Sequence, residues 1–362
     1  MPVIVPWEPT EAANQVLRYL QSGQCVALPT ESTYELVASA HCIEAVDQLS
    51  RAVVSGEFAA IVLSDYAQLH DWMPRLTGAG TRLFRKLGAG PYTFRGRGGY
   101  EQGLAPRLPD SARRLVVRDD RLALRWPDQP IWAKLGQAGL PLVSLPLPGA
   151  VNMGMAVSLV GENAACIVDA GAAQHALPPS IVEADGRRCR LTRAGALTGE
   201  QLDALTCSRI LFVCTGNTCR SPMAEALCAK LLTDRLGGTR ADLLKHGFSV
   251  QSAGLAAMMG NEASSEAVQV ASDLGADLSA HRSAPATIAM LQWADFVFAM
   301  TASHWYSLKS ANVPGAPTPR MLSPLFEDVV DPIGAGLLDY QTCARQILDS
   351  LQQRLPEILE SM

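Results

Sequence analysis

The residue types best suited to chemistry lie in one short stretch of the sequence, between Cys214 and Pro222. Cys214 and Arg220 are separated by five residues, which places a thiol and a guanidinium at the two ends of one short loop. A cysteine thiolate is a strong nucleophile, and a guanidinium can form two parallel hydrogen bonds with a phosphate. The pair therefore predicts nucleophilic attack on a phosphoryl group. The spacing alone is weak evidence, and a buried structural cysteine is the alternative for Cys214.

The flanking residues predict how this stretch is held. The apolar run 209–213 directly before the cysteine predicts a buried strand, and Gly216 and Asn217 are residue types that tolerate a positive φ. Ser221 and Pro222 are typical of a helix N-cap and of the first helical position. A strand, a tight loop and a helix N-terminus together form an anion site, and the same positive potential favours the thiolate form of the cysteine.

A transfer of this kind also needs a general acid for the leaving group and a base for the attacking water. Asp331 is the candidate, because Pro332 and Gly334 mark its surroundings as a loop, and a loop carboxylate can reach the anion site. A turn aspartate that caps the next segment is an equally good interpretation of Asp331. The sequence leaves both interpretations open.

The elements that must position these residues alternate along the second half of the chain. Strands are expected at 209–213, 248–252 and 295–300. Helices are expected at about 222–232, 261–275, 284–292 and 337–360. Such alternation predicts an α/β fold with a parallel sheet and helices on both faces.

Length and composition indicate a folded protein of two domains. The chain has 362 residues, of which 48% are hydrophobic and 18% charged, and its net charge of −5 argues against a strongly basic nucleic-acid binder. Its nine cysteines include no Cys-x-x-Cys pair, which argues against a disulfide framework and a structural zinc site. Without a signal-peptide pattern or a run of about 20 apolar residues, we expect a cytoplasmic protein with no membrane partner. The segment 193–208 suits a linker, so we expect domains at 1–200 and 207–362.

Residues 208–362 resemble the low-molecular-weight protein tyrosine phosphatase family over the whole domain. The resemblance rests on the order and spacing of several pieces of sequence. They are Val213–Glu225, Ser252–Gly254, His281–Ser283, Ala294–His304, and Asp331-Pro332 with Tyr340 behind them.

This resemblance implies a cysteine-dependent phosphatase that acts on a phosphorylated protein and uses no cofactor and no metal. It implies Cys214 as the nucleophile, Arg220 as the phosphate clamp, and Asp331 as the general acid and base. It also implies a phosphate-binding loop and two residues that support its shape. The loop residues are Thr215, Gly216, Asn217, Thr218, Cys219 and Ser221, and the supporting residues are Ser252 and His281. For Cys219 the family implies a reversible disulfide with the nucleophile under oxidation, with plain packing as an equally good alternative.

Two positions bear on the substrate. Thr218 stands where tyrosine-specific members carry an aliphatic residue, and Ile333-Gly334 stand where those members usually carry aromatic residues. This combination resembles the protein-arginine-phosphatase branch, because a guanidinium needs hydrogen-bond acceptors where a phenol needs apolar walls. We expect phosphoarginine as the substrate, with phosphotyrosine as the alternative. An arsenate reductase would need further redox cysteines, and none lies between Cys228 and Cys343.

Residues 10–196 resemble, more loosely, the YrdC/Sua5 family of threonylcarbamoyl-adenylate synthases, which act on threonine, bicarbonate and ATP in tRNA modification. Strand-like runs at 59–63, 122–125, 140–144 and 165–168 predict a twisted α/β sheet. The matching pieces are Pro29–Glu31 with Tyr34, Gly90–Thr93, Leu122–Arg125, Pro141–Ser144, Ser180–Val182 and Arg193–Gly195.

This half departs from the family where the nucleotide phosphates would bind. The family's three cations correspond to Arg51, Val53 and Glu57, so one cation remains and one charge is reversed, and Leu145–Pro148 replaces the family's Ser-Ala-Asn. Burial of a triphosphate without these cations is unfavourable. We therefore expect a degenerate domain that has lost synthase activity and serves ligand binding or regulation.

The first half still carries residues that could hold a nucleotide-like or RNA-like ligand. These are Thr30, Tyr34, Arg125, Ser180 and Arg193. Ten arginines between Arg82 and Arg125 offer either an RNA-binding face or an ordinary solvated surface. The alternative for the whole chain is a nucleotide- or RNA-binding protein, or a threonylcarbamoyl-AMP synthase-like protein of tRNA modification, with a subordinate phosphatase half.

Overall fold

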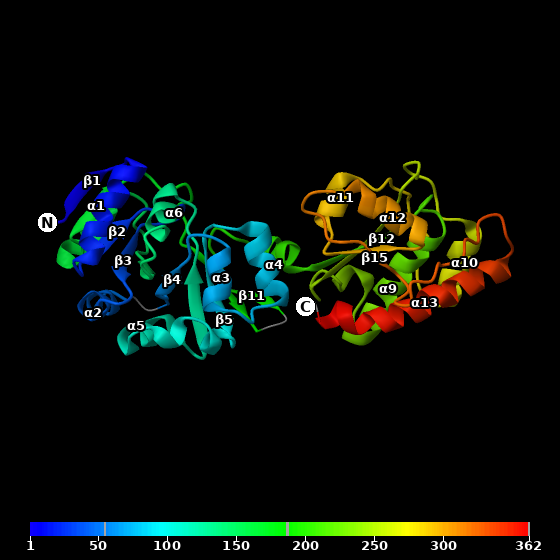
Figure 1. Ribbon diagram of the computed structural model, residues 1–362, viewed down its shortest axis with the longest axis horizontal. Helices are drawn as coiled ribbons and strands as arrows, with labels where there is room; N and C mark the ends of the chain where they lie inside the picture. Colours follow the sequence, from blue (N-terminus) through cyan, green and yellow to red (C-terminus); the bar gives the residue numbers. More distant parts are fainter. Residues whose placement is uncertain (54–55, 186–187, 361–362) are drawn as a thin grey trace. The chain divides into compact units, whose positions relative to one another are not determined.

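The computed structural model describes residues 1–53, 56–185 and 188–360 (Figure 1). The chain forms two compact units, Met1–Thr206 and Cys207–Met362. Each unit combines helices with a β-sheet, so the fold class is α/β, as the sequence predicted. In these described parts, none of the helices has both the length and the apolar character that a membrane span requires.

The second unit is built on a parallel sheet with the strand order β13-β12-β14-β15. The strands are β12 (Ser208–Cys214), β13 (Phe248–Gly254), β14 (Phe296–Ala299) and β15 (Arg320–Met321). The chain passes from β12 to β13 on one side and later to β14 on the other side. Ligand sites of α/β proteins lie at the carboxyl ends of strands beside such a switch point. Cys214 is the last residue of β12 and therefore lies at this place.

Helices cover both faces of this sheet because alternate side chains of β12 point into two cores. Ile210 and Phe212 belong to the core that includes α9, α10 and α13, whereas Leu211 and Val213 belong to the core with α11 and α12. Figure 1 shows α11 and α12 on one side of the sheet and α9 and α13 on the other. The helices are α9 (Arg220–Leu236), α10 (Ser265–Asp273), α11 (Ile288–Trp293), α12 (Ala302–Ala311) and α13 (Leu337–Glu360).

Two helices of this unit begin later than the sequence predicted. α10 begins at Ser265 rather than near 261, and α11 begins at Ile288 rather than near 284. The backbone just before each helix pairs with the loop after β12 or with the end of β13 instead. The N–H of Ser264 donates to the carbonyl of Thr218 at 3.0 Å, and the carbonyl of Ala284 accepts the N–H of Gly254 at 2.9 Å.

The first unit contains a mixed sheet, which in the described residues has the order β1-β9-β2-β3-β8-β4-β7-β5-β10-β11, with β6 beside β7. Its strands are β1 (Val3–Pro6), β2 (Val26–Leu28), β3 (Glu35–Ser39), β4 (Ala60–Val62), β5 (Tyr92–Arg97), β6 (Val117–Arg118), β7 (Arg121–Arg125), β8 (Leu142–Pro146), β9 (Cys166–Asp169), β10 (Ser180–Ala184) and β11 (Cys189–Arg193). Strands therefore lie in all four runs that the sequence marked as strand-like.

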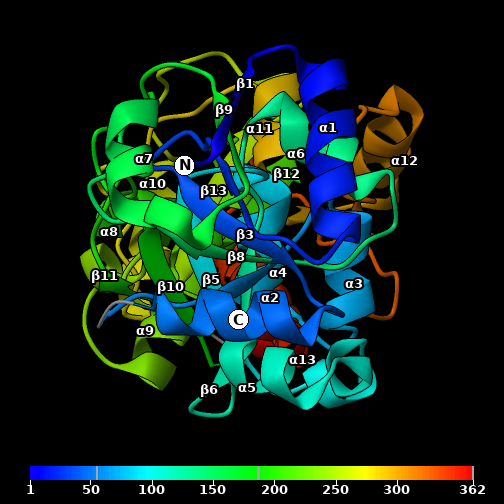
Figure 2. The ribbon, with the colours of Figure 1, turned by 90° about the vertical axis from the view of Figure 1, so that its left-hand side faces the viewer.

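Two cores lie on the two faces of this sheet. Helices α1 and α6 pack in one core with β2 and β9, and α2 and α5 pack in the other with β3 and β7. Figure 2 shows α1 and α6 on the side of the sheet opposite to α2 and α5. The helices are α1 (Pro9–Gln21), α2 (Ile43–Arg51), α3 (Ala67–Trp72), α4 (Gly78–Leu87), α5 (Asp110–Val116), α6 (Pro130–Gly136), α7 (Met153–Val160) and α8 (Gly199–Thr206).

The linker expected at 193–208 is largely a folded part of the first unit. Arg193 ends β11, α8 packs against β11 and α4, and Leu197 and Leu202 are buried in the core. The glycines suggested a loose chain, but a Cβ atom on Gly195 would lie only 2.2 Å from the carbonyl oxygen of Pro178. Close packing, rather than flexibility, therefore explains glycine at this position.

Candidate active site

Cys214 lies at the start of the loop that connects β12 to α9, and only 2% of the residue is exposed. Its Sγ atom lies 3.0 Å from the Oγ atom of Ser221 and accepts a hydrogen bond from the N–H of Asn217 at 3.2 Å. The backbone N–H donor stabilises a thiolate, and the N-terminus of α9 adds a positive potential. These surroundings suit a nucleophilic sulfur.

The start of α9 differs from the sequence-based expectation. The helix begins at Arg220 with Cys219 in the N-cap position, so Ser221 lies inside the first turn and is not the cap. The Ser221 hydroxyl faces the Cys214 sulfur and donates to the carbonyl of Ala253 at 3.2 Å. The preference of serine for N-caps is local, and here these tertiary partners determine its place.

Asn217 organises the loop from inside. The residue is fully buried and has a φ of 55°, a left-handed conformation that asparagine tolerates. Its side-chain amide donates to the Oγ atoms of Ser221 and Ser252, both at 2.9 Å, and its Oδ1 atom accepts the N–H of Ala284 at 2.8 Å. Its carbonyl accepts a hydrogen bond from Nε2 of His281 at 2.8 Å. Ser252 and His281 thus both contact the loop.

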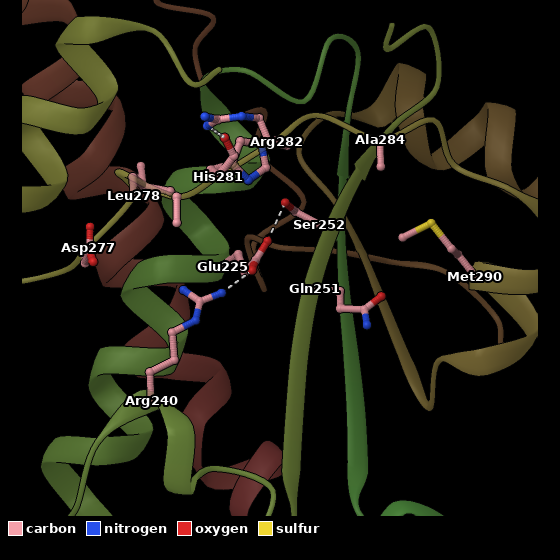
Figure 3. A pocket seen from close by; sticks show the side chains of 11 residues that line it. Glu225, Arg240, Gln251, Ser252, Asp277, Leu278, His281, Arg282, Ala284 and Met290 are labelled. Atoms are coloured by element: carbon pink, nitrogen blue, oxygen red, sulfur yellow. Dashed lines mark hydrogen bonds and ion pairs between the residues drawn. The ribbon is translucent and has the colours of Figure 1, made fainter. Parts of the chain in front are cut away.

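A chain of interactions continues from Ser252 away from the loop (Figure 3). The Ser252 hydroxyl donates to Oε2 of Glu225 at 2.6 Å, and Glu225 forms an ion pair with Arg240. These residues and His281 border a cavity of about 360 Å³. None of residues 214–221 is among its described lining residues, so the cavity flanks the supporting network and not the thiol.

Gly254, the last residue of β13, allows the loop to approach the sheet. A Cβ atom at this position would lie 2.4 Å from the carbonyl oxygen of Thr215 and 2.9 Å from the backbone nitrogen of Asn217. Sequence reasoning gave no role to Gly254 or to Glu225. The four-residue spacing of Ser221 and Glu225, which puts both on one face of α9, was the available signal.

Arg220 and Asp331 are in direct contact although they are 111 positions apart in the sequence. The Nη2 atom of Arg220 donates to Oδ2 of Asp331 at 2.6 Å. The Arg220 side chain is 6% exposed, whereas 43% of the Asp331 side chain is exposed. The other oxygen, Oδ1, accepts the N–H of Ile333 at 3.3 Å, which is the turn contact of the alternative interpretation. One carboxylate therefore makes both contacts.

Cys219 contacts α13 and the segment just before α10. Its Sγ atom lies 3.3 Å from the hydroxyl of Tyr340 and 3.4 Å from that of Ser264. Burial and the contact with Cys219 raise the pKa of Tyr340 to about 12. All nine cysteines are free thiols, so the disulfide that the resemblance implies for Cys219 stays a prediction.

Three candidate ligand residues of the first unit bond to neighbouring protein groups. The Thr30 hydroxyl donates to the carbonyl of Thr33 at 2.6 Å, and the Tyr34 hydroxyl donates to that of Gly171 at 3.3 Å. The Ser180 hydroxyl accepts the N–H of Leu197 at 2.9 Å. All three candidates are buried.

The other two candidates, Arg125 and Arg193, are held by carboxylates. Arg125 is fully buried and lies 2.8 Å from Oε1 of both Glu31 and Glu35. Burial alone would raise the pKa of Glu31, but the charge of Arg125 and hydrogen bonds hold it below its usual value. Nη2 of Arg193 donates to Oε2 of Glu57 at 3.1 Å. Burial raises the pKa of Glu57, against the opposing effect of its pairing with Arg193.

The arginines between Arg82 and Arg125 do not all face solvent. Arg95, Arg121 and Arg125 have side chains that are at most 11% exposed, and each pairs with a carboxylate. Such buried ion pairs are structural and take these cations away from an RNA-binding face.

Comparison with known proteins agrees with this geometry. The family model for low molecular weight phosphotyrosine protein phosphatase matches residues 209–361. A protein-arginine-phosphatase of Geobacillus stearothermophilus is 38% identical over 161 residues, which are 42% of this chain and 97% of the relative. A protein-arginine-phosphatase of Bacillus subtilis is 34% identical over 42% of this chain and 96% of the relative. A probable low molecular weight protein-tyrosine-phosphatase EpsP of Ralstonia nicotianae is 30% identical over 41% of this chain and 94% of the relative.

The fold, the loop around Cys214 and these relatives define a cysteine-dependent phosphatase. Through its second unit the chain belongs to the low molecular weight phosphotyrosine protein phosphatase family. Residues 18–195 match the Sua5/YciO/YrdC family model, described as telomere recombination, so the first unit is similar to that family.

Proposed function

We propose that the second unit hydrolyses phosphoarginine in protein substrates through a phosphocysteine intermediate. The observation that carries this proposal is the contact between Arg220 and Asp331 at the N-terminus of α9, beside the buried thiol of Cys214. A nucleophile, a cation for the phosphoryl oxygens and a carboxyl group for proton transfer then serve one reaction.

In the first step the Cys214 thiolate attacks phosphorus, and the bond from phosphorus to the guanidine nitrogen breaks. Arg220 and the loop N–H groups stabilise the phosphoryl oxygens, and Asp331 gives its proton to the leaving nitrogen. A doubly charged phosphoryl group competes with the carboxylate of Asp331 for the guanidinium. Its arrival therefore frees the carboxyl group to take up a proton.

In the second step water attacks the phosphocysteine. Asp331 accepts a proton from this water, and the bond from sulfur to phosphorus breaks. Inorganic phosphate leaves and the Cys214 thiolate is restored. Every group in this cycle comes from the chain, the substrate and water.

The choice of phosphoarginine rests on Thr218 in the loop and on Ile333 just after Asp331-Pro332. Thr218 is half-buried and brings a hydroxyl, while Ile333, which follows the Asp331-Pro332 pair, is 67% exposed and not aromatic. A guanidinium gains from a nearby hydroxyl, whereas a phenol ring gains from flat apolar walls. The names of two relatives, both protein-arginine-phosphatases, also support this choice.

Thr218→Ile tests the substrate. We expect it to shift the ratio of kcat/KM toward phosphotyrosine by about five- to tenfold, because one polar contact is worth about 1 kcal/mol. The measurement compares matched phosphoarginine and phosphotyrosine peptides, with Thr342→Ile on the exposed side of α13 as the control. Cys214→Ser is expected to abolish both activities. An unchanged ratio in Thr218→Ile contradicts the assignment, and turnover by Cys214→Ser contradicts the mechanism.

For the first unit we propose a regulatory or ligand-binding role without synthase chemistry. The pairs Arg193–Glu57 and Arg125–Glu31 support this proposal, because they neutralise two cations that a nucleotide would need. The nucleotide- or RNA-binding alternative would require these ion pairs to open.

A further inference from the structure

His304 forms two side-chain hydrogen bonds that link α12 to the loop. It lies in the first turn of α12 and is 6% exposed. Its Nε2 atom lies 2.8 Å from the Oγ1 atom of Thr215, the residue directly after the nucleophile. Its Nδ1 atom lies 2.8 Å from the Oγ1 atom of Thr301, the N-cap of α12. The imidazole thus bridges the start of a helix and the start of the loop.

Thr215 is also fixed from the opposite side. Its carbonyl accepts the N–H of Ala256 at 2.9 Å, and the absence of a Cβ atom on Gly254 lets that carbonyl lie against β13. The first peptide of the loop is therefore held between β13 and the hydroxyl contact with His304. Without the contact to His304, one of these two restraints is lost.

The hydrogen bonds fit a neutral imidazole with its proton on Nε2. Thr301 Oγ1 already accepts the backbone N–H of His304 at 3.3 Å, which leaves its own proton to donate to Nδ1. Nε2–H then donates to Thr215. Burial and the positive charge of Arg220 lower the pKa of His304, while Asp331 and Asp328 act in the opposite direction. The neutral form is therefore favoured at neutral pH.

We propose that His304 is a positioning residue of the phosphatase reaction, which holds Thr215 and so fixes the first turn of the loop that receives the phosphoryl group. This inference rests on the function proposed for that loop. The interaction would act through Thr215, so the two residues must behave as one unit.

A double-mutant cycle in the full chain tests this inference with p-nitrophenyl phosphate as substrate. We expect His304→Leu and Thr215→Val each to lower kcat/KM about three- to tenfold, which is the effect of one lost hydrogen bond. The kcat/KM of the double variant should be no lower than that of the less active single variant. His246→Leu removes an imidazole outside the site and should leave kcat/KM unchanged. Losses that multiply in the double variant would overturn the inference, and Thr215→Val keeps it testable if His304→Leu unfolds.

A pH profile separates positioning from a purely structural role. His304→Gln keeps a donor near the position of Nε2 and cannot gain a proton, so it should retain most of the activity at pH 8. Protonation of His304 at acid pH puts a proton on Nδ1, which can then no longer accept a hydrogen bond from Thr301. The imidazole loses one of its two restraints, so the activity of His304→Gln relative to wild type should rise. A ratio that is constant between pH 5 and 8 would contradict the role. If the wild type turns over and Cys214→Ser does not, such a result leaves the proposed function intact.

Discussion

At the scale of single residues, Asn217 determines both the backbone path and the hydrogen bonds of the loop. Its backbone is left-handed and its side chain is buried. The side-chain amide donates to Ser221 and Ser252, and its Oδ1 atom accepts the N–H of Ala284. An aliphatic side chain would remove these three hydrogen bonds from a buried place, which is costly. The loop therefore depends on asparagine here in two separable ways.

Substitution of Asn217 can separate these two contributions. Asn217→Ala should lower the free energy of unfolding by about 2–4 kcal/mol, because buried partners lose their hydrogen bonds and alanine is disfavoured at positive φ. Asn217→Gly removes the same hydrogen bonds but tolerates this φ, so it should be more stable than alanine by about 1 kcal/mol. Urea unfolding measures both, and turnover of p-nitrophenyl phosphate should fall at least tenfold in each. Equal stability of the two variants would show that backbone strain contributes nothing.

Asp331 shows where sequence reasoning reaches its limit at this scale. The sequence left a turn role and a catalytic role open, and the carboxylate bonds both the turn N–H of Ile333 and the guanidinium of Arg220. The turn contact follows from local sequence. The contact with Arg220 depends on how distant segments return to the sheet edge, which spacing along the chain does not encode.

At the scale of elements, the carboxyl ends of β12 and β13 form the platform of the site. The predicted strands and helices of the second unit are present, because their apolar runs and helical periodicity are strong local signals. The late starts of α10 and α11 were not predictable in this way. Residues 261–264 and 284–287 have helix-compatible composition. In the fold, however, Ser264 pairs with Thr218 and Ala284 pairs with Gly254 through backbone hydrogen bonds, so both helices begin after these residues.

Gly254→Ala tests how closely β13 and the loop must approach each other. The new Cβ atom would meet backbone atoms of Thr215 and Asn217 at 2.4 and 2.9 Å, so the loop must move. We expect kcat/KM for p-nitrophenyl phosphate to fall at least tenfold, since displacement of a reacting group by about 1 Å can cost a hundredfold. Gly199→Ala in α8, where the added atom has open space, is the matched control. Wild-type turnover in Gly254→Ala would mean that the loop does not need this close contact.

At the scale of the whole molecule, the chain joins two units that resemble different families, and the two units differ in how their candidate site residues are arranged. The second unit brings Cys214, Arg220 and Asp331 to one sheet edge. In the first unit the candidate ligand residues bond to neighbouring protein groups, and Arg193 forms an ion pair with Glu57. The sequence showed the charge reversal at Glu57. Only the fold could show which cation this carboxylate would meet, because Glu57 and Arg193 are 136 positions apart in the sequence.

This pairing leads to a prediction for the intact chain. Supplied with ATP, threonine and bicarbonate, it should release no pyrophosphate, because a triphosphate would have to displace Glu57 from Arg193 and would then lie beside a buried carboxylate. Phosphatase turnover in the same mixture should equal turnover without these compounds. An active threonylcarbamoyl-adenylate synthase in the same assay shows that the conditions support the reaction. Threonine-dependent release of pyrophosphate that persists in Cys214→Ser would assign synthase chemistry to the first unit and overturn its proposed degeneration.

Glu57→Lys tests the ion pair by an independent measurement, the free energy of unfolding. The substitution places two cations together at a site where residue 57 is 6% exposed. Breaking such a pair should lower the free energy of unfolding by about 3–5 kcal/mol, whereas Glu44→Lys on the exposed side of α2 should change it by less than about 0.5 kcal/mol.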